Sequence, residues 1–261
     1  MTQVQTTSSL SRLRLVAGDR ATNAAMLMEL VHEQAGFADA RGLPQVHWFA
    51  DFETWEEMRR ARGKRTRQRI PRPFYSPEAH AIYLPPSVTQ AVTNGFSEVN
   101  DLDGLVSVLH ELLHGARYAT MRSLRAYLVE GLTEGFARYL ACEYLTPPRV
   151  LLREEVNALL ADGNPLTELS VQTVEVLASL TQPNRESARQ WLCAVVRSEE
   201  PQTLLQAAVA HLLSSSAPSA RAERVLRIPT LLSRVLHAAQ ARDGLTLTMG
   251  EVWYPDGITV W

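Results

Sequence analysis

Apolar positions recur along the chain at two spacings, one typical of helices and one typical of strands. Between residues 22 and 38 they fall three or four apart, which predicts an amphipathic helix that ends before Gly42-Leu43-Pro44. Residues 45–50 read Gln-Val-His-Trp-Phe-Ala and predict a strand. Residues 51–62 begin with Asp51 and place acidic residues before basic ones, which is typical of a capped helix.

The middle of the chain continues with a hairpin and two long helices. Residues 74–86 hold two runs of aromatic or β-branched residues around a turn that contains Pro77, which predicts a β-hairpin. We expect a loop over 85–100 and helices over about 102–118 and 124–145. A strand, a helix, a hairpin and a further helix in this order favour an α+β fold with a small mixed sheet.

The second half of the chain changes character twice. From Pro147 to Asp243 the pattern is helical, and interruptions rich in Pro, Gly, Asn and Ser predict four or five helices. Residues 245–261 alternate again around Tyr254-Pro255-Asp256-Gly257 and predict a terminal hairpin. We therefore divide the chain into a core over 1–146 and a mainly helical lobe with a terminal hairpin over 147–261.

The strongest chemical signal lies in the first of the two long helices. Residues 110–114 read His-Glu-Leu-Leu-His, and residues four apart on a helix project side by side, so His110 and His114 can share one metal ion. Glu111 lies next to them and can act as the general base of a metal-assisted hydrolysis. Apolar residues of the same run predict a buried face: Leu105, Leu109, Leu112 and Leu113. Asp101 or Asp103 is expected to cap this helix.

A third metal ligand has to come from elsewhere in the chain. The metzincin pattern would need Gly at 117 and His at 120, but the chain has Arg117 and Thr120. A carboxylate on a following helix completes three protein ligands and one open position. Glu130 and Glu134 lie one turn apart on the second long helix. One of them can bind the metal, and the other can accept a hydrogen bond from a ligand histidine and fix its tautomer.

With these two segments the chain resembles the gluzincin-type metallopeptidases of the zincin superfamily, over roughly residues 74–140. In that branch the helix after His-Glu-x-x-His carries an aromatic residue, Leu, Glu-Gly and a further acid, and the Glu before the Gly is the zinc ligand. The resemblance implies a zincin-like core, a Zn²⁺ ion and a peptide substrate.

Two alignments of that second motif compete in this chain. Tyr127-Leu128-Val129-Glu130-Gly131 matches the aromatic residue, the Leu and the later acid at Glu134. Glu134-Gly135-Phe136-Ala137-Arg138-Tyr139 matches the other half of the motif, with a longer gap after His114. We prefer Glu130 as ligand and Glu134 as the residue that orients a ligand histidine, because only this alignment uses both acids.

The hairpin before the active-site helix adds to the resemblance. In zincins, a strand at this place in the chain forms the upper rim of the cleft and pairs with an extended substrate. Ala79–Leu84 is similar in position, which implies substrate binding by strand addition. An ordinary sheet strand is the alternative reading.

Composition gives little further direction. Of the 261 residues, 46% are hydrophobic and 21% charged, which is ordinary for a soluble globular protein, and the formal net charge of −2 does not favour nucleic acid or anionic lipid as partners. Lys64 is the only lysine, and the richness in Arg, Ala and Leu suggests a GC-rich bacterial or phage genome. No signal peptide or membrane-spanning run is visible, so we expect a cytoplasmic protein. Cys142 and Cys193 are expected to be reduced thiols; a cysteine that blocks the zinc is the less favoured alternative.

Two further groups of residues are candidates for a functional role, one in nucleic-acid binding and one in stabilising an oxyanion. Arg59–Arg72 holds eight basic residues in fourteen, but it has no interleaved aromatics for base stacking, so a solvated loop is favoured over a nucleic-acid surface. Hydrolysis also requires a donor to the oxyanion. The candidates are His211, His237, Tyr139 and Tyr254. We treat His32, His47 and His80 as structural or surface residues.

The sequence therefore predicts a zinc metallopeptidase, with His110, His114 and Glu130 as ligands, Glu111 as base and a peptide or protein as substrate. The alternative is a zincin fold that serves as a binding, structural or regulatory protein, such as a phage-particle component, with a retained zinc site.

Overall fold

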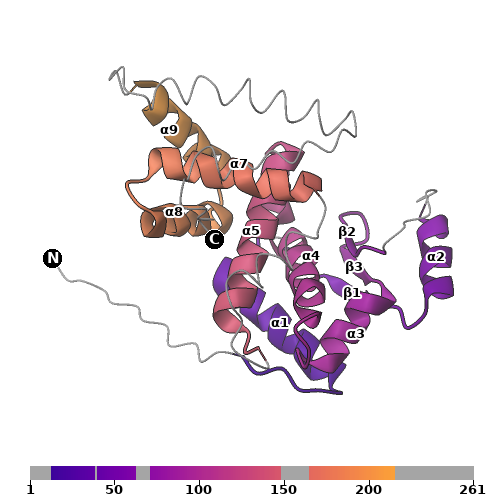
Figure 1. Cartoon of the computed structure of the whole chain (residues 1–261). Helices are drawn as coiled ribbons and strands as arrows, with labels where there is room; N and C mark the ends of the chain where they lie inside the picture. Colours follow the sequence, from indigo (N-terminus) through magenta and orange to yellow (C-terminus); the bar gives the residue numbers. More distant parts are fainter. Residues whose placement is uncertain (1–12, 39, 63–70, 148–164, 215–261) are drawn as a thin grey trace.

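The computed structural model describes residues 13–38, 40–62, 71–147 and 165–214, and Figure 1 shows how its elements are arranged. The class is α+β, as predicted: a small mixed sheet lies beside a larger set of helices. In chain order the elements are α1 (Arg20–Ala35), β1 (Gln45–Trp48), α2 (Phe52–Ala61), β2 (Phe74–Ser76), β3 (Ala81–Leu84), α3 (Pro86–Asn94), α4 (Asp101–Met121), α5 (Ala126–Tyr144), α7 (Pro165–Thr181), α8 (Arg185–Arg197) and α9 (Pro201–Ser214).

The sheet of the described residues has three strands in the order β1-β3-β2. β3 pairs in parallel with β1 and antiparallel with β2, so the predicted hairpin is confirmed. The prediction that Ala79–Leu84 offers its edge to a substrate is wrong, because neighbours occupy both edges of β3. All four residues of β3 are buried, as expected for a central strand. The outer edge of the hairpin belongs to β2.

The loop predicted over 85–100 contains a helix, α3. Pro86 stands in its first turn, where a missing backbone N–H costs nothing, and Val88, Ala91 and Val92 are buried at helical spacing. Gly95 ends the helix in the left-handed region at φ 65°. Pro86 and the Asn94-Gly95 pair mark the two ends of this short helix.

The two motif helices are confirmed and lie side by side near the centre of Figure 1. Leu105, Leu109, Leu112 and Leu113 of α4 are buried, as predicted. The predicted cap is wrong in detail: α4 has no side-chain cap, and the Asp101 carboxylate accepts hydrogen bonds from the backbone N–H of Glu98 and the Asn94 side chain. This aspartate ties the start of α4 to the end of α3.

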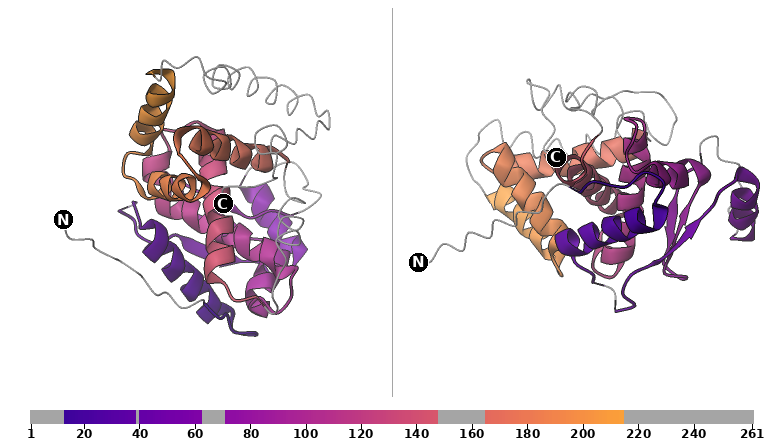
Figure 2. Two further views of the ribbon diagram at one scale, coloured as in Figure 1. Left: turned by 60° about the vertical axis from the view of Figure 1, so that its left-hand side comes forward. Right: turned by 90° about the horizontal axis from the view of Figure 1, so that it is seen from below.

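The helices α7, α8 and α9 form what we call the helical lobe, which packs against α5 from the side opposite the sheet (Figure 2). Two of the predicted breaks, at 182–184 and at Pro201, separate these helices as expected. Apolar side chains from α1, α4, α5 and the lobe share one buried cluster. Gly131 permits the contact between α5 and α7, because a β-carbon there would lie 2.2 Å from the carbonyl oxygen of Ser170. The predicted terminal hairpin over 245–261 lies outside the described residues.

In the described part of the chain, no helix combines the length and the apolar character that a membrane span requires.

Candidate metal centre

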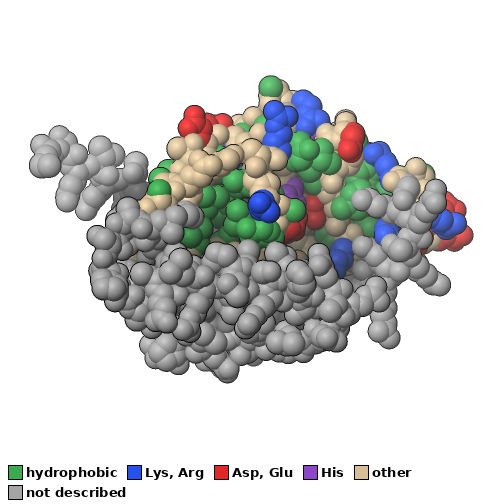
Figure 3. All heavy atoms as spheres, turned by 90° about the horizontal axis from the view of Figure 1, so that it is seen from above, with side chains coloured by type: hydrophobic (Ala, Val, Ile, Leu, Met, Phe, Trp, Pro, Cys, Tyr) green, Lys and Arg blue, Asp and Glu red, His purple; other side chains and the backbone are tan. Residues whose placement is uncertain are grey.

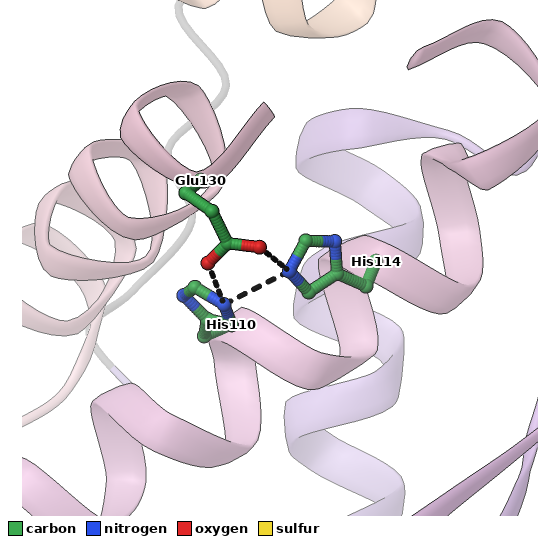
Figure 4. Close-up of side chains that lie close together, drawn as sticks. All are labelled: His110, His114 and Glu130. Carbon is green, nitrogen blue, oxygen red and sulfur yellow. Dashed lines mark hydrogen bonds and ion pairs between the residues drawn. The ribbon is translucent and has the colours of Figure 1, made fainter. Parts of the chain in front are cut away.

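The predicted ligand side chains converge between α4 and α5 (Figure 4). His110 and His114 lie one turn apart on α4, and their Nε2 atoms are 2.9 Å from each other. Glu130 of α5 faces them, with one carboxylate oxygen 3.4 Å from His110 Nε2 and the other 3.4 Å from His114 Nε2. One donor atom from each of the three residues lies within 4.8 Å of the others, so this cluster could hold a metal ion.

The spacing of these donors fits a small divalent cation. Ligand bonds of about 2.0–2.1 Å in tetrahedral geometry separate neighbouring donors by about 3.3 Å. The two 3.4 Å distances, one from each Glu130 oxygen, are each close to this value, and the 2.9 Å between the histidines is somewhat shorter. Two imidazole nitrogens and one carboxylate form a donor set typical of zinc sites, with room for a further ligand.

Glu134 lies behind the cluster and contacts the other ring nitrogen of His110. The Nδ1 of His110 is 2.8 Å from a Glu134 carboxylate oxygen. Because an ionised carboxylate only accepts, Nδ1–H donates, and in the neutral ring the lone pair is on Nε2, facing Glu130 and His114. Glu130 thus belongs to the cluster that could hold a metal ion, whereas Glu134 contacts the far nitrogen of the His110 ring.

The carboxylates of Glu130 and Glu134 both have lowered pKa values. Burial raises the pKa of Glu134, but the hydrogen bond and charge of His110, together with Arg138, outweigh burial and lower it to about 2. Burial likewise opposes ionisation of Glu130, but hydrogen bonds from His110 and His114 hold its pKa well below the usual range. Both carboxylates are therefore anionic near neutral pH, and the centre attracts cations.

Glu111 is buried next to His110 on α4, a helix that contacts β2 and β3. Burial raises the pKa of Glu111 and outweighs the charges of His110 and His114 and a backbone hydrogen bond from Tyr75, all of which lower it. A raised pKa makes this carboxylate a better proton acceptor near neutral pH than an exposed glutamate. The Tyr75 N–H also places the outer edge of β2 next to Glu111.

Metal binding at this centre should release a proton from His110. Burial lowers the pKa of His110, but hydrogen bonds to Glu130 and Glu134 outweigh it and hold the pKa well above its ordinary value. The raised pKa favours the protonated ring, and a cation that binds at Nε2 must displace that proton. We expect zinc binding at pH 7 to release about one proton, and affinity to fall as the pH is lowered. Calorimetric titrations in two buffers with different ionisation heats measure the release; identical heats in both would contradict it.

The centre is open to solvent on one side. The Glu130 side chain is 43% exposed, whereas Glu134 and His110 are mostly covered. In Figure 3, a histidine and adjacent acidic side chains reach the surface between groups of hydrophobic side chains. A ligand can therefore approach from the side of Glu130.

The candidate oxyanion donors and the two cysteines do not belong to this cluster in the described part of the chain. Tyr139 is nine residues from Glu130, on the opposite face of α5, and its ring packs against Phe136 and Tyr144. Cys142 is exposed and Cys193 is buried, and neither belongs to the ligand cluster. His237 and Tyr254 lie outside the described residues, as does the side chain of His211.

The basic stretch is described only in part, since residues 63–70 lie outside the structure's described ranges. Two of its members have structural partners. Arg59 is buried and forms an ion pair with Glu56, and the guanidinium of Arg62 lies 4.7 Å from the centre of the Tyr83 ring. Arg59 is therefore not part of a free basic surface, whereas Arg62 remains exposed beside the Tyr83 ring.

Three residues near the centre were missed. Arg138 donates to Glu134 and to Glu168 of α7, and Tyr75 contacts Glu111 through its backbone. The i,i+4 spacing of Glu134 and Arg138 is a signal that could have indicated the first contact. The sequence holds no such signal for Glu168 and Tyr75, because their contacts with Arg138 and Glu111 depend on how α7 and β2 pack.

No protein-family model matches this chain, and no curated protein or solved structure matches it significantly.

Proposed function

We propose that this protein is a zinc-dependent metallopeptidase with a gluzincin-type site. The observation that carries the proposal is the convergence of His110, His114 and Glu130 within 4.8 Å, on the two helices that bear the resemblance. Three protein donors that leave a position open to solvent favour a catalytic site over a closed structural one. The α+β arrangement of a small sheet beside these helices is compatible with a zincin-like core.

The surrounding residues have complementary roles in peptide hydrolysis. Zinc, when bound, would polarise the scissile carbonyl and lower the pKa of water toward 7. Glu111 accepts a proton from the attacking water and later delivers it to the leaving amine, which suits its raised pKa. Glu134 holds the His110 ring in place through Nδ1.

The outer edge of β2 is the proposed place for an extended substrate. β2 is an edge strand of the described sheet, and its Tyr75 N–H points to Glu111. A peptide bound along this edge would lie beside the general base, but regular strand pairing is limited there, because the Tyr75 N–H already donates to Glu111 and Pro73 and Pro77 have no N–H. We thus propose β2, and not the predicted Ala79–Leu84, as the strand that lies beside the substrate.

The proposal is tested by measuring metal content and peptide cleavage together. We expect the purified protein to bind about one zinc per chain and to cleave members of a broad peptide library. A chelator should abolish cleavage, and added zinc should restore it. Mass spectrometry of the digest identifies the cleaved bonds. Zinc bound without cleavage of any peptide would instead support the non-catalytic zincin-fold alternative, and absence of zinc binding would overturn both.

A further inference from the structure

A chain of charged hydrogen bonds links the metal centre to the helical lobe. His110 Nδ1 is 2.8 Å from one oxygen of Glu134, and Arg138 Nε is 2.8 Å from the other. A second nitrogen of Arg138 lies 2.7 Å from Glu168 of α7. The chain therefore runs from a metal ligand on α4, through two residues of α5, to a carboxylate of the lobe.

These side chains are largely withdrawn from water. The side chains of Glu134 and Arg138 are 14% and 13% exposed, and that of Glu168 is 27% exposed. A buried carboxylate that loses a hydrogen-bond partner cannot readily replace it with water. Each side chain in this series therefore holds the orientation of its neighbour. The close packing of α7 on Gly131 holds the backbone that carries Glu168 against α5.

We infer that Arg138 and Glu168 are positioning residues of the metal centre, through which the helical lobe sets metal affinity. This inference rests on the proposed zinc site. The two oxygens of Glu134 face two different donors, and Arg138 occupies one so that the other stays directed at His110. Glu168 in turn holds the guanidinium in the orientation that this contact requires. Loss of either residue frees Glu134 to rotate and His110 to turn its Nε2 away from Glu130.

The charge of Arg138 and its contact with Glu134 predict opposite effects on zinc affinity when Arg138 is removed. By Coulomb's law alone, removing a cation near the centre should strengthen the binding of Zn²⁺. If Arg138 acts by orienting Glu134, its removal should weaken zinc binding by about tenfold, the lower end of what residues that support metal ligands contribute. The sign of the change in affinity therefore separates the two explanations.

The experiment measures zinc affinity by competition with a chromophoric chelator for Arg138→Gln, Arg138→Lys and Glu168→Gln. We expect weaker binding in all three variants, least in Arg138→Lys, because lysine keeps the charge but lacks the planar fork. Arg189→Gln is the matched control: Arg189 also joins the lobe to α5, through Glu143, and is not part of this chain of contacts. It should bind zinc like the wild type.

Two further measurements exclude a merely structural role. In a Glu134→Gln background, Arg138→Gln should weaken zinc binding no further, because its effect passes through Glu134. The visible spectrum of the Co²⁺-loaded protein should change in Arg138→Gln and not in Arg189→Gln. Circular dichroism checks the fold, and if Arg138→Gln does not fold, Arg138→Lys decides, because it keeps the charge, whereas Glu168→Gln removes an anion and would weaken zinc binding by charge alone.

Three results would overturn the inference. They are unchanged or tighter zinc binding in folded Arg138→Gln, full additivity with Glu134→Gln, and an equal loss in Arg189→Gln. Zinc binding without peptidase activity would refute the proposed function and leave this inference standing. Failure of the wild type to bind zinc would remove both.

Discussion

Replacement of Glu111 by Gln should lower peptide hydrolysis by about 10²- to 10⁴-fold, the range that a positioned general base contributes. The amide has nearly the shape of the carboxylate but cannot accept a proton at neutral pH. Because Glu111 is not one of the converging ligands, zinc should remain bound. The measurements are kcat/KM on a peptide from the library digest and zinc content of the same sample.

The pKa of Glu111 gives the same variant an expected effect on stability. Burial raises this pKa in the folded chain, so above the pKa of the unfolded state the ionised carboxylate opposes folding. The neutral amide removes that cost, and Glu111→Gln should unfold at an equal or higher temperature at pH 7. Glu29→Gln, an exposed change on α1, is the matched control and should alter neither activity nor zinc content. Retained hydrolysis by zinc-loaded Glu111→Gln would contradict the proposed role.

The parts of the centre that could be predicted from the sequence are those fixed by spacing along one helix. His110 and His114 meet because residues four apart share a helical face, and Glu130 and Glu134 follow the same rule on the next helix. Which acid faces the metal depends on how α5 is rotated against α4, and helix spacing alone does not fix that rotation. The contact between Arg138 and Glu168 depends in addition on α7, which reaches α5 through Gly131.

The errors in the predicted fold have related causes. Residues 86–94 carry the helical spacing of Val88, Ala91 and Val92, but the segment is short and bounded by proline and glycine, so loop signals outweighed it. The edge of the hairpin was assigned wrongly because strand order is a tertiary property. β1 lies far from β3 in sequence, yet it pairs with it and leaves β2 on the outside.

Glu130→Gln should weaken zinc binding by more than the 10–100-fold that residues supporting metal ligands contribute, whereas Glu134→Gln should weaken it by about 10–100-fold. Glu130 directs one oxygen to each histidine Nε2 and is a donor to the metal in our proposal. The glutamine side chain in the variant would offer the metal a single, neutral oxygen. Zinc affinity is measured by chelator competition, with Glu143→Gln, an exposed change on the same helix, as the control.

The effect of Glu134→Gln has a different origin. Both oxygens of Glu134 accept hydrogen bonds, one from His110 Nδ1–H and one from Arg138 Nε–H. Glutamine offers one oxygen and one NH₂ group, so one of these donors must face another donor. The His110 ring then loses its fixed orientation, but all three metal donors remain. If Glu134→Gln abolished zinc binding while Glu130→Gln kept it, the two acids would have exchanged roles, and the alignment that places the zinc ligand at Glu134 would be the correct one.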